Sequence, residues 1–304
     1  MREEFFFEVE KEYAGQRVDK YLQKKLILRF SRTLIKKNIE NNNVLVNSLP
    51  VKPHHKLKKH DKISVLLMQQ ESHNDMVPLD IPLDVVFEDD CILVINKPAG
   101  MVVHPAAGHR DDTLVNALLA HTPKLSDVSG PVKLGVVHRL DKDTSGLLVV
   151  AKDNRTHEIL AEQFKKHQVK KIYIALVLGR VERDEGLIDA PLSRNPFNRK
   201  KIAVVFASKR NAQTYYRVLK RNNEYSVLEV QPKTGRTHQI RVHLTYLGHS
   251  IIGDKTYGKT SPRFDIQRQA LHASLLGFLH PRTSQYVEFK AALPEDMRKI
   301  AERL

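Results

Sequence analysis

The stretch GVVHRLDKDTSGLLVVAK (Gly135–Lys152) carries two apolar runs joined by a polar loop. We expect the apolar runs to form strands, because Val- and Leu-rich runs bounded by polar and glycine residues are typical of buried strands. The loop HRLDKDTSG (His138–Gly146) places the carboxylate of Asp141 between the basic residues Arg139 and Lys142. A loop this polar between two core strands suggests either a tight turn or a functional site.

The residues of this loop leave three interpretations open. Asp, Thr, Ser and Gly are common turn residues, so the loop could be a turn alone. Asp141 and Asp143 could be paired oxygen ligands of a metal ion, although two flanking cations and the lack of a third acidic ligand oppose this. Alternatively, a nearby arginine could keep Asp141 ionised as a nucleophile or base. The turn and the catalytic carboxylate remain equally open at this point.

A second polar segment is KTGRTHQIRVHL (Lys233–Leu244). Its alternating pattern predicts a strand over residues 237–243, with one polar face formed by Thr237, Gln239, Arg241 and His243. His238, Ile240 and Val242 would share the other face. Arg241 would then be available to pair with a carboxylate. A zinc site from His238 and His243 is not expected, because the two would point in opposite directions and cysteine ligands are absent.

Two further segments carry candidate functional residues. INKPAGMVVHPAAGH (Ile95–His109) is a rigid loop after a strand, in which Lys97 could contact a phosphate or be solvated. KKIYIALVLG (Lys170–Gly179) places Tyr173 among alternating apolar residues. That tyrosine could be a core aromatic residue or a flat surface on which a base stacks.

The composition favours a polyanionic partner. Lys and Arg number 50 against 35 Asp and Glu, which gives a net charge of +15. The single cysteine, Cys91, lies in an apolar run and is expected in the core, and one cysteine permits no internal disulfide. No apolar run approaches the length of a membrane span. These features predict a cytoplasmic protein that binds nucleic acid and not a membrane.

A polar segment with two nearby prolines suggests a domain boundary, with a linker over residues 73–81. Residues 1–72 contain 15 Lys and Arg and nine Asp and Glu, a net charge of +6. We expect a small basic α/β module there, with helices over residues 16–26 and 31–40 and two strands. Arg32 and Lys36 on the second helix are candidates for contact with a nucleic-acid backbone.

Residues 82–304 are rich in expected strands, namely 83–89, 91–97, 146–152, 171–179, 225–231, 238–244 and 286–291. Expected helices cover 113–122, 156–167 and 294–304. Strands and helices do not alternate regularly, which argues against a doubly wound parallel sheet. We therefore predict the α+β class, with a mixed, largely antiparallel sheet and flanking helices.

Four motifs in this order resemble the RluA superfamily of pseudouridine synthases: INKPAGMVVHP, GVVHRLDKDTSGLLVVAK, KKIYIAL and TGRTHQIRVH. The resemblance runs from about residue 82 to the C-terminus and is greatest to the RluD-like branch. The N-terminal module is similar to a small RNA-binding domain shared with a ribosomal protein. The resemblance implies isomerisation of specific uridines to pseudouridine in large-subunit (23S-type) ribosomal RNA.

The resemblance also implies roles for individual residues. Asp141 matches the catalytic aspartate, and Arg139 matches the arginine that displaces the target nucleotide. Tyr173 matches the tyrosine that packs on the base, Arg241 the basic partner of the aspartate, and Ile240 an apolar wall of the uracil pocket. An isomerisation adds and removes nothing, so we expect no metal and no small-molecule cofactor. The expected partner is ribosomal RNA or the pre-ribosomal large subunit.

Other functions remain open at this stage. The chain could act on tRNA or on another ribosomal site. It could also be a non-catalytic RNA-binding factor in ribosome assembly, or a metal-dependent nuclease that uses Asp141 and Asp143. A point substitution at Asp141 and sensitivity to chelators would distinguish these possibilities.

Overall fold

The computed structural model describes residues 2–26, 32–68, 76–105, 108–109, 111–130, 133–258 and 264–303. The chain divides into two compact units. One comprises Met1–Val77 with Val128–Val132, and the other comprises Pro78–Asp127 with Lys133–Leu304. Part of the expected linker over 73–81 lies outside the described residues. Among the described residues, no helix combines the length and apolar character needed to cross a membrane.

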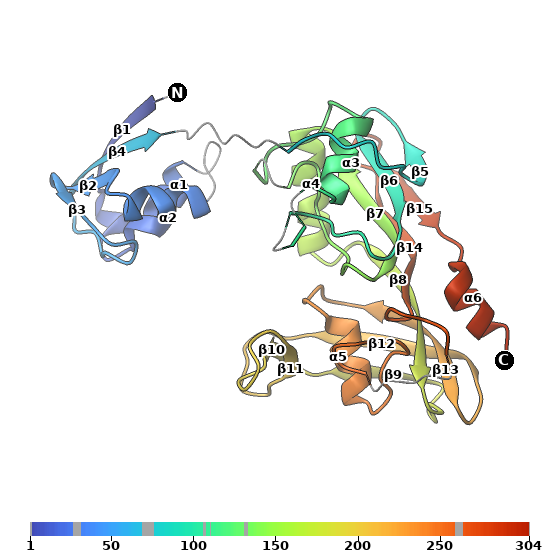
Figure 1. Ribbon diagram of the computed structural model, residues 1–304. Helices are drawn as coiled ribbons and strands as arrows, with labels where there is room; N and C mark the ends of the chain where they lie inside the picture. Colours follow the sequence, from blue (N-terminus) through green and yellow to red (C-terminus); the bar gives the residue numbers. More distant parts are fainter. Residues whose placement is uncertain are drawn as a thin grey trace. The chain divides into compact units, whose positions relative to one another are not determined.

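The first unit pairs a small sheet with two helices (Figure 1). Its elements are β1 (Arg2–Glu8), the 3₁₀ turn η1 (Lys11–Tyr13), α1 (Val18–Lys25), α2 (Arg32–Glu40), β2 (Val44–Val46), β3 (Leu49–Pro50) and β4 (Lys62–Met68). The sheet is antiparallel in the order β1-β4-β2-β3. The apolar residues Val18 and Leu22 of α1 and Ile35 and Ile39 of α2 are buried in its core, as their helical spacing predicts.

The second unit is built on one large sheet and contains few helices. Its strands are β5 (Val85–Glu88), β6 (Ile92–Lys97), β7 (Ser145–Ala151), β8 (Lys170–Leu178), β9 (Glu185–Asp189), β10 (Leu192–Arg194), β11 (Ile202–Val204), β12 (Gln213–Arg221), β13 (Tyr225–Pro232), β14 (Leu271–Leu279) and β15 (Tyr286–Lys290). Its helices are α3 (Leu114–His121), α4 (Asn154–Lys165), α5 (Gln239–Tyr246) and α6 (Glu295–Ala301).

The large sheet has nine strands, in the order β5-β6-β7-β14-β8-β13-β12-β9, and β15 also pairs with β14 (Figure 1). All of these pairings are antiparallel except that between β7 and β14, which is parallel. The pair β10 and β11 forms a separate hairpin. The predicted α+β class with a largely antiparallel sheet is therefore confirmed.

The parallel junction of β7 and β14 depends on Gly146. This residue has φ +115°, and a Cβ built on it would lie 2.3 Å from the carbonyl oxygen of Ala273. The two backbones can approach this closely only where no side chain intervenes. Gly146 ends the polar loop that contains Asp141, so the same contact fixes where that loop leaves the sheet.

Two predicted strands are wrong. The apolar run before the polar loop is not a strand, and only Val136 forms an isolated bridge, to Val150. Residues 239–246 form the helix α5 instead of a strand. Residues 239–244 are all buried. The alternation of polar and apolar residues predicted a strand with one face in solvent. Because both kinds of residue are buried here, the alternation does not indicate an exposed face.

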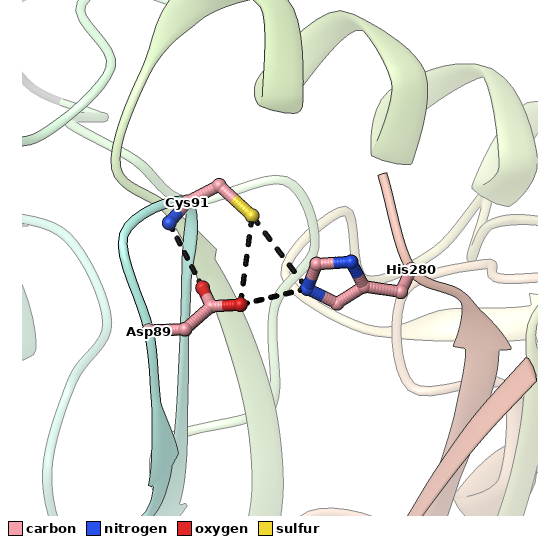
Figure 2. Close-up of side chains that lie close together, drawn as sticks. All are labelled: Asp89, Cys91 and His280. Carbon is pink, nitrogen blue, oxygen red and sulfur yellow. Dashed lines mark hydrogen bonds and ion pairs between the residues drawn. The ribbon is translucent and has the colours of Figure 1, made fainter. Parts of the chain in front are cut away.

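A cluster of three side chains ties the turn between β5 and β6 to the end of β14 (Figure 2). Asp89 Oδ2 accepts a hydrogen bond from His280 Nε2 at 2.8 Å, and Cys91 Sγ lies 3.6 Å from the same nitrogen. His280 Nδ1 accepts from the backbone N–H groups of Arg282 and Thr283, at 3.4 and 3.3 Å, so Nε2 carries the ring proton. Burial raises the pKa of the Cys91 thiol to about 11, consistent with its expected core position.

We predict that Gly146→Ala destabilises the protein strongly, because the added Cβ meets the backbone of Ala273 and the residue keeps a positive φ. Equilibrium denaturation should show a loss of more than about 2 kcal/mol. Gly235→Ala is the matched control, since nothing lies within 4 Å of a Cβ there. Equal stability of the two variants would contradict this account of the β7–β14 junction.

Candidate active site

A cavity of about 530 Å³ opens in the middle of the second unit. Its walls come from the polar loop before β7, from β8, and from the segment that connects β13 to α5. All five residues to which the sequence resemblance gives a role line it: Arg139, Asp141, Tyr173, Ile240 and Arg241. The volume lies within the range of roughly 300–1,000 Å³ that is usual for small-ligand sites.

Arg241 of α5 joins two carboxylates at this cavity. Its Nη1 donates to Asp141 Oδ2 at 2.9 Å. On the other side its Nε and Nη2 donate to Asp254 at 2.7 and 2.9 Å, a bidentate pair. The structure thus brings together Asp141 and Arg241, which lie 100 residues apart in sequence. It adds a second carboxylate that the sequence did not single out.

The charges of Arg241 and Asp254 hold each other ionised. Burial lowers the pKa of the Arg241 guanidinium, but the hydrogen bonds and charge of Asp254, with those of Asp141, outweigh burial and raise that pKa above its ordinary value. Burial likewise raises the pKa of the Asp254 carboxyl. Its hydrogen bonds with Arg241, aided by the N–H groups of Tyr257 and Thr256, bring that pKa below the ordinary value.

Asp254 is anchored by a tight turn of its own. Its Oδ1 accepts from the backbone N–H groups of Thr256 and Tyr257, at 2.8 and 3.0 Å, and its side chain is only 1% exposed. The Tyr257 ring lies against the Arg241 guanidinium, with 5.1 Å between Cζ and the ring centroid. The sequence DKTYG carries a turn signal at this point, but nothing in it shows which buried arginine the carboxylate meets.

The start of α5 aims its first residues into the cavity. His238 caps the helix in the left-handed region, with φ 54° and ψ 19°. The Gln239 side chain folds back, and its Oε1 accepts from the Arg236 N–H and the Thr234 hydroxyl. These bonds fix the turn that leads into α5, while the His238 side chain makes no capping hydrogen bond to the helix. Ile240 follows as a buried apolar wall of the cavity.

Lys97 does not face the cavity, and the expectation that it contacts a phosphate or is solvated is wrong. Its ammonium is fully buried and donates to the carbonyl oxygens of Pro98, Met101 and Lys142, at 2.7, 3.0 and 3.0 Å. Burial lowers the pKa of Lys97 to about 7. The Lys142 carbonyl also accepts from the Gly100 N–H at 3.0 Å. Through the Lys142 carbonyl, Lys97 thus fixes the position of the polar loop.

Of the two other cavity residues, Arg139 is the more exposed and Tyr173 the more buried. Arg139 is exposed at its rim. Tyr173, on β8, is half-buried, and burial together with the charge of Asp141 raises the pKa of its phenol, so it stays protonated. The exposed guanidinium can reach a bound ligand from outside, and the aromatic ring offers a flat inner surface.

The remaining candidates lie elsewhere. Lys36, in the first unit, is exposed and pairs with Glu40 at 3.4 Å, and the Arg32 side chain lies outside the described residues. His243 is buried, with its ring nitrogens bonded to Thr214 and the Ala190 carbonyl. Within the described residues, the Asp89 cluster of Figure 2 is the one group of three that could hold a metal ion. It lies outside the cavity and includes neither Asp141 nor Asp143.

We predict that Asp254→Asn lowers the free energy of unfolding by about 3 kcal/mol or more, because it leaves Arg241 with half of its buried negative partners. Denaturation of the exposed control variant Asp184→Asn, which loses only a solvent-exposed pair with Arg221, should show a much smaller change.

The effect of Asp254→Asn should also depend on pH. The pKa of Asp254 is below 3.8 in the folded protein and ordinary when unfolded, so its stabilising effect is complete above 3.8. It is lost as the pH falls through the lower folded-state value. The stability difference from wild type should thus be constant near neutral pH and shrink only in acid. A difference that instead grows in acid would contradict this assignment.

Comparison with known proteins shows which family this chain resembles. The RNA pseudouridylate synthase family model matches residues 91–246, about half of the chain. An uncharacterized RNA pseudouridine synthase, YlyB, of Bacillus subtilis (strain 168) is 44% identical over 96% of this chain and 95% of its own length. The ribosomal large subunit pseudouridine synthase D of Zymomonas mobilis is 45% identical over 96% of this chain and 95% of its own length.

Solved structures agree with these relatives. Human RNA Pseudouridylate Synthase Domain Containing 1 is 25% identical with a TM-score of 0.57, and the match covers 73% of this chain and 94% of that one. Domain Containing 4 gives a TM-score of 0.56 at 26% identity, over 72% and 92% of the two chains. The resemblance to RluD-like members of the RluA superfamily is confirmed. The chain belongs to the RNA pseudouridine synthases.

Proposed function

We propose that this chain converts specific uridines of large-subunit ribosomal RNA to pseudouridine, with Asp141 as its catalytic carboxylate. One observation carries the proposal: at the cavity, Arg241 binds Oδ2 of Asp141 and leaves Oδ1 directed away from that bond. Its relatives named ribosomal large subunit pseudouridine synthase D support the choice of RNA. Ribosomal RNA as substrate implies action in the cytoplasm.

The reaction breaks the bond between uracil N1 and ribose C1′, turns the base and rejoins it through C5. The Asp141 carboxylate can act on the sugar or on the base, and Arg241 orients it in either case. The base must first leave its stack, which costs a few kcal/mol. We assign Arg139 at the rim to the displaced strand, Tyr173 to stacking on uracil, and Ile240 to the pocket wall.

A basic hairpin beside the cavity supports RNA as the ligand. The segment Leu192–Arg210, which contains β10 and β11, has six Lys and Arg and no Asp or Glu. Phe197 at its tip is 98% exposed and Phe206 is 71% exposed. The Asn195 side chain shapes the turn at the tip by accepting from the N–H groups of residues 197 and 198. Aromatic side chains among cations are typical of surfaces that bind nucleic acid.

The first unit is proposed as a second RNA contact. We propose the domain limits expected from the sequence: a basic module over 1–72, a linker over 73–81 and a catalytic domain over 82–304. The excess positive charge of residues 1–72 supports this role, with Arg32 and Lys36 of α2 as contacts to the RNA backbone. Such contacts raise affinity without reading sequence.

We predict that Asp141→Asn abolishes pseudouridine formation while RNA binding stays near that of the wild type. Release of tritium from large-subunit RNA labelled at uracil C5 measures turnover, and filter binding measures affinity. Asp143→Asn is the matched control in the same loop and should keep its activity, because the Asp143 side chain does not line the cavity. Turnover by Asp141→Asn close to that of the wild type would refute the assignment.

We predict that Arg32→Gln with Lys36→Gln weakens RNA affinity and lowers its dependence on salt, while turnover at saturating RNA is retained. Each lost phosphate contact should reduce the salt slope by about 1. The control is Arg298→Gln with Lys299→Gln on α6, where Lys299 forms a helical pair with Glu295 like that of Lys36 with Glu40. If both double variants bind RNA equally well, the module is not an RNA contact.

A further inference from the structure

His238, at the cavity wall, has an energetically unfavourable backbone conformation. It is not a glycine, yet it adopts φ 54°, and such left-handed residues cost of the order of 1–3 kcal/mol unless their surroundings enforce them. Its ring reaches two partners. Nδ1 lies 2.8 Å from the Tyr257 hydroxyl oxygen, and Nε2 lies 3.9 Å from Asp141 Oδ1. Strain at a cavity wall points to a role for this ring.

The hydrogen bonds of Tyr257 and the charge of Asp141 together favour one tautomer of His238. The backbone N–H of Ile202 donates to the Tyr257 oxygen at 2.9 Å. In the arrangement that uses the hydroxyl proton within this cluster, Tyr257 donates it to His238 Nδ1, and Nε2 then carries the ring proton. This proton faces the negative Oδ1 of Asp141, which favours the same tautomer.

The charge of the ring is consistent with a neutral donor. Burial lowers the pKa of His238, and the positive charge of Arg241 acts in the same direction, against the raising effect of Asp141. Burial also raises the pKa of the Tyr257 hydroxyl, so that group keeps its proton. The cavity therefore presents a neutral N–H beside a carboxylate oxygen.

The distance between His238 Nε2 and Asp141 Oδ1 determines which chemical group of a ligand fits between them. At 3.9 Å, Nε2 and Oδ1 are too far apart to bond to each other. One oxygen atom can lie at hydrogen-bond distance, about 2.8 Å, from both. That oxygen must accept from His238 and donate to Asp141, which a hydroxyl does and a carbonyl does not. A nucleotide inside an RNA chain has one free hydroxyl, at C2′, because its 3′ and 5′ oxygens are esterified and its O4′ is a ring ether.

We propose that His238 Nε2 and Asp141 Oδ1 together bind the 2′-hydroxyl of the target uridine. Tyr257 acts as a positioning residue that keeps the His238 proton on Nε2. The inference rests on the proposed function, since it takes a uridine within an RNA chain as substrate. It makes this pair the point at which the protein distinguishes ribose from deoxyribose.

The test compares one RNA with uridine or 2′-deoxyuridine at the target position alone. The measured quantity is the ribose preference, the ratio of kcat/KM for the two substrates, or the ratio of Kd where the deoxy substrate is not converted. The variants are His238→Gln, whose amide nitrogen reaches the Nε2 position, and His238→Asn, whose amide reaches only the Nδ1 position. Asn also tolerates the left-handed backbone, so folding is preserved and thermal melting verifies it.

We expect the ribose preference to fall about tenfold in His238→Asn, the effect of losing one hydrogen bond of ordinary strength. His238→Gln should keep most of the preference, and Tyr257→Phe should lose part of it. The proposal is overturned if His238→Asn slows both substrates by the same factor, or if all variants keep the wild-type preference. A wild-type protein that forms no pseudouridine in any RNA would instead contradict the proposed function.

Discussion

The bridge made by Arg241 between two carboxylates is the interaction on which the site depends. A buried guanidinium costs several kcal/mol of lost hydration, and the bidentate bond to Asp254 offsets that cost. With Asp254 securing one side of the guanidinium, the remaining Nη1 holds Asp141 in a fixed direction. The Asp254 pair therefore fixes the guanidinium that orients the cavity carboxylate.

The sheet supplies the precision that this bridge requires. Arg241 and Asp141 come from segments 100 residues apart, so their 2.9 Å contact survives only if both segments are fixed. The loop of Asp141 is held from below by the buried Lys97 ammonium and at its end by Gly146 against β14. These contacts determine where the carboxylate lies before any ligand enters, so little reorganisation remains for the reaction.

Most strands of the large sheet could be predicted from sequence, because short apolar runs such as CILVINK are typical of buried strands. The helix α5 could not, because its alternating pattern resembles a strand, and the burial of residues 239–244 removes the exposed face that periodicity would indicate. Asp254 was missed for a related reason: its turn is visible locally, but its partner Arg241 is a tertiary contact. Lys97 was misjudged because lysine is rarely buried, and only the three carbonyls around it explain its place.

The central claim is that the Asp141 carboxylate, held by Arg241, makes this chain a pseudouridine synthase of large-subunit RNA. The most direct measurement is a map of pseudouridines by carbodiimide-dependent stops of reverse transcription, in RNA from cells that carry either the wild-type gene or Asp141→Asn. The account predicts that defined stops in large-subunit RNA are present with the wild type and absent with the variant. Identical maps from the two strains would contradict it.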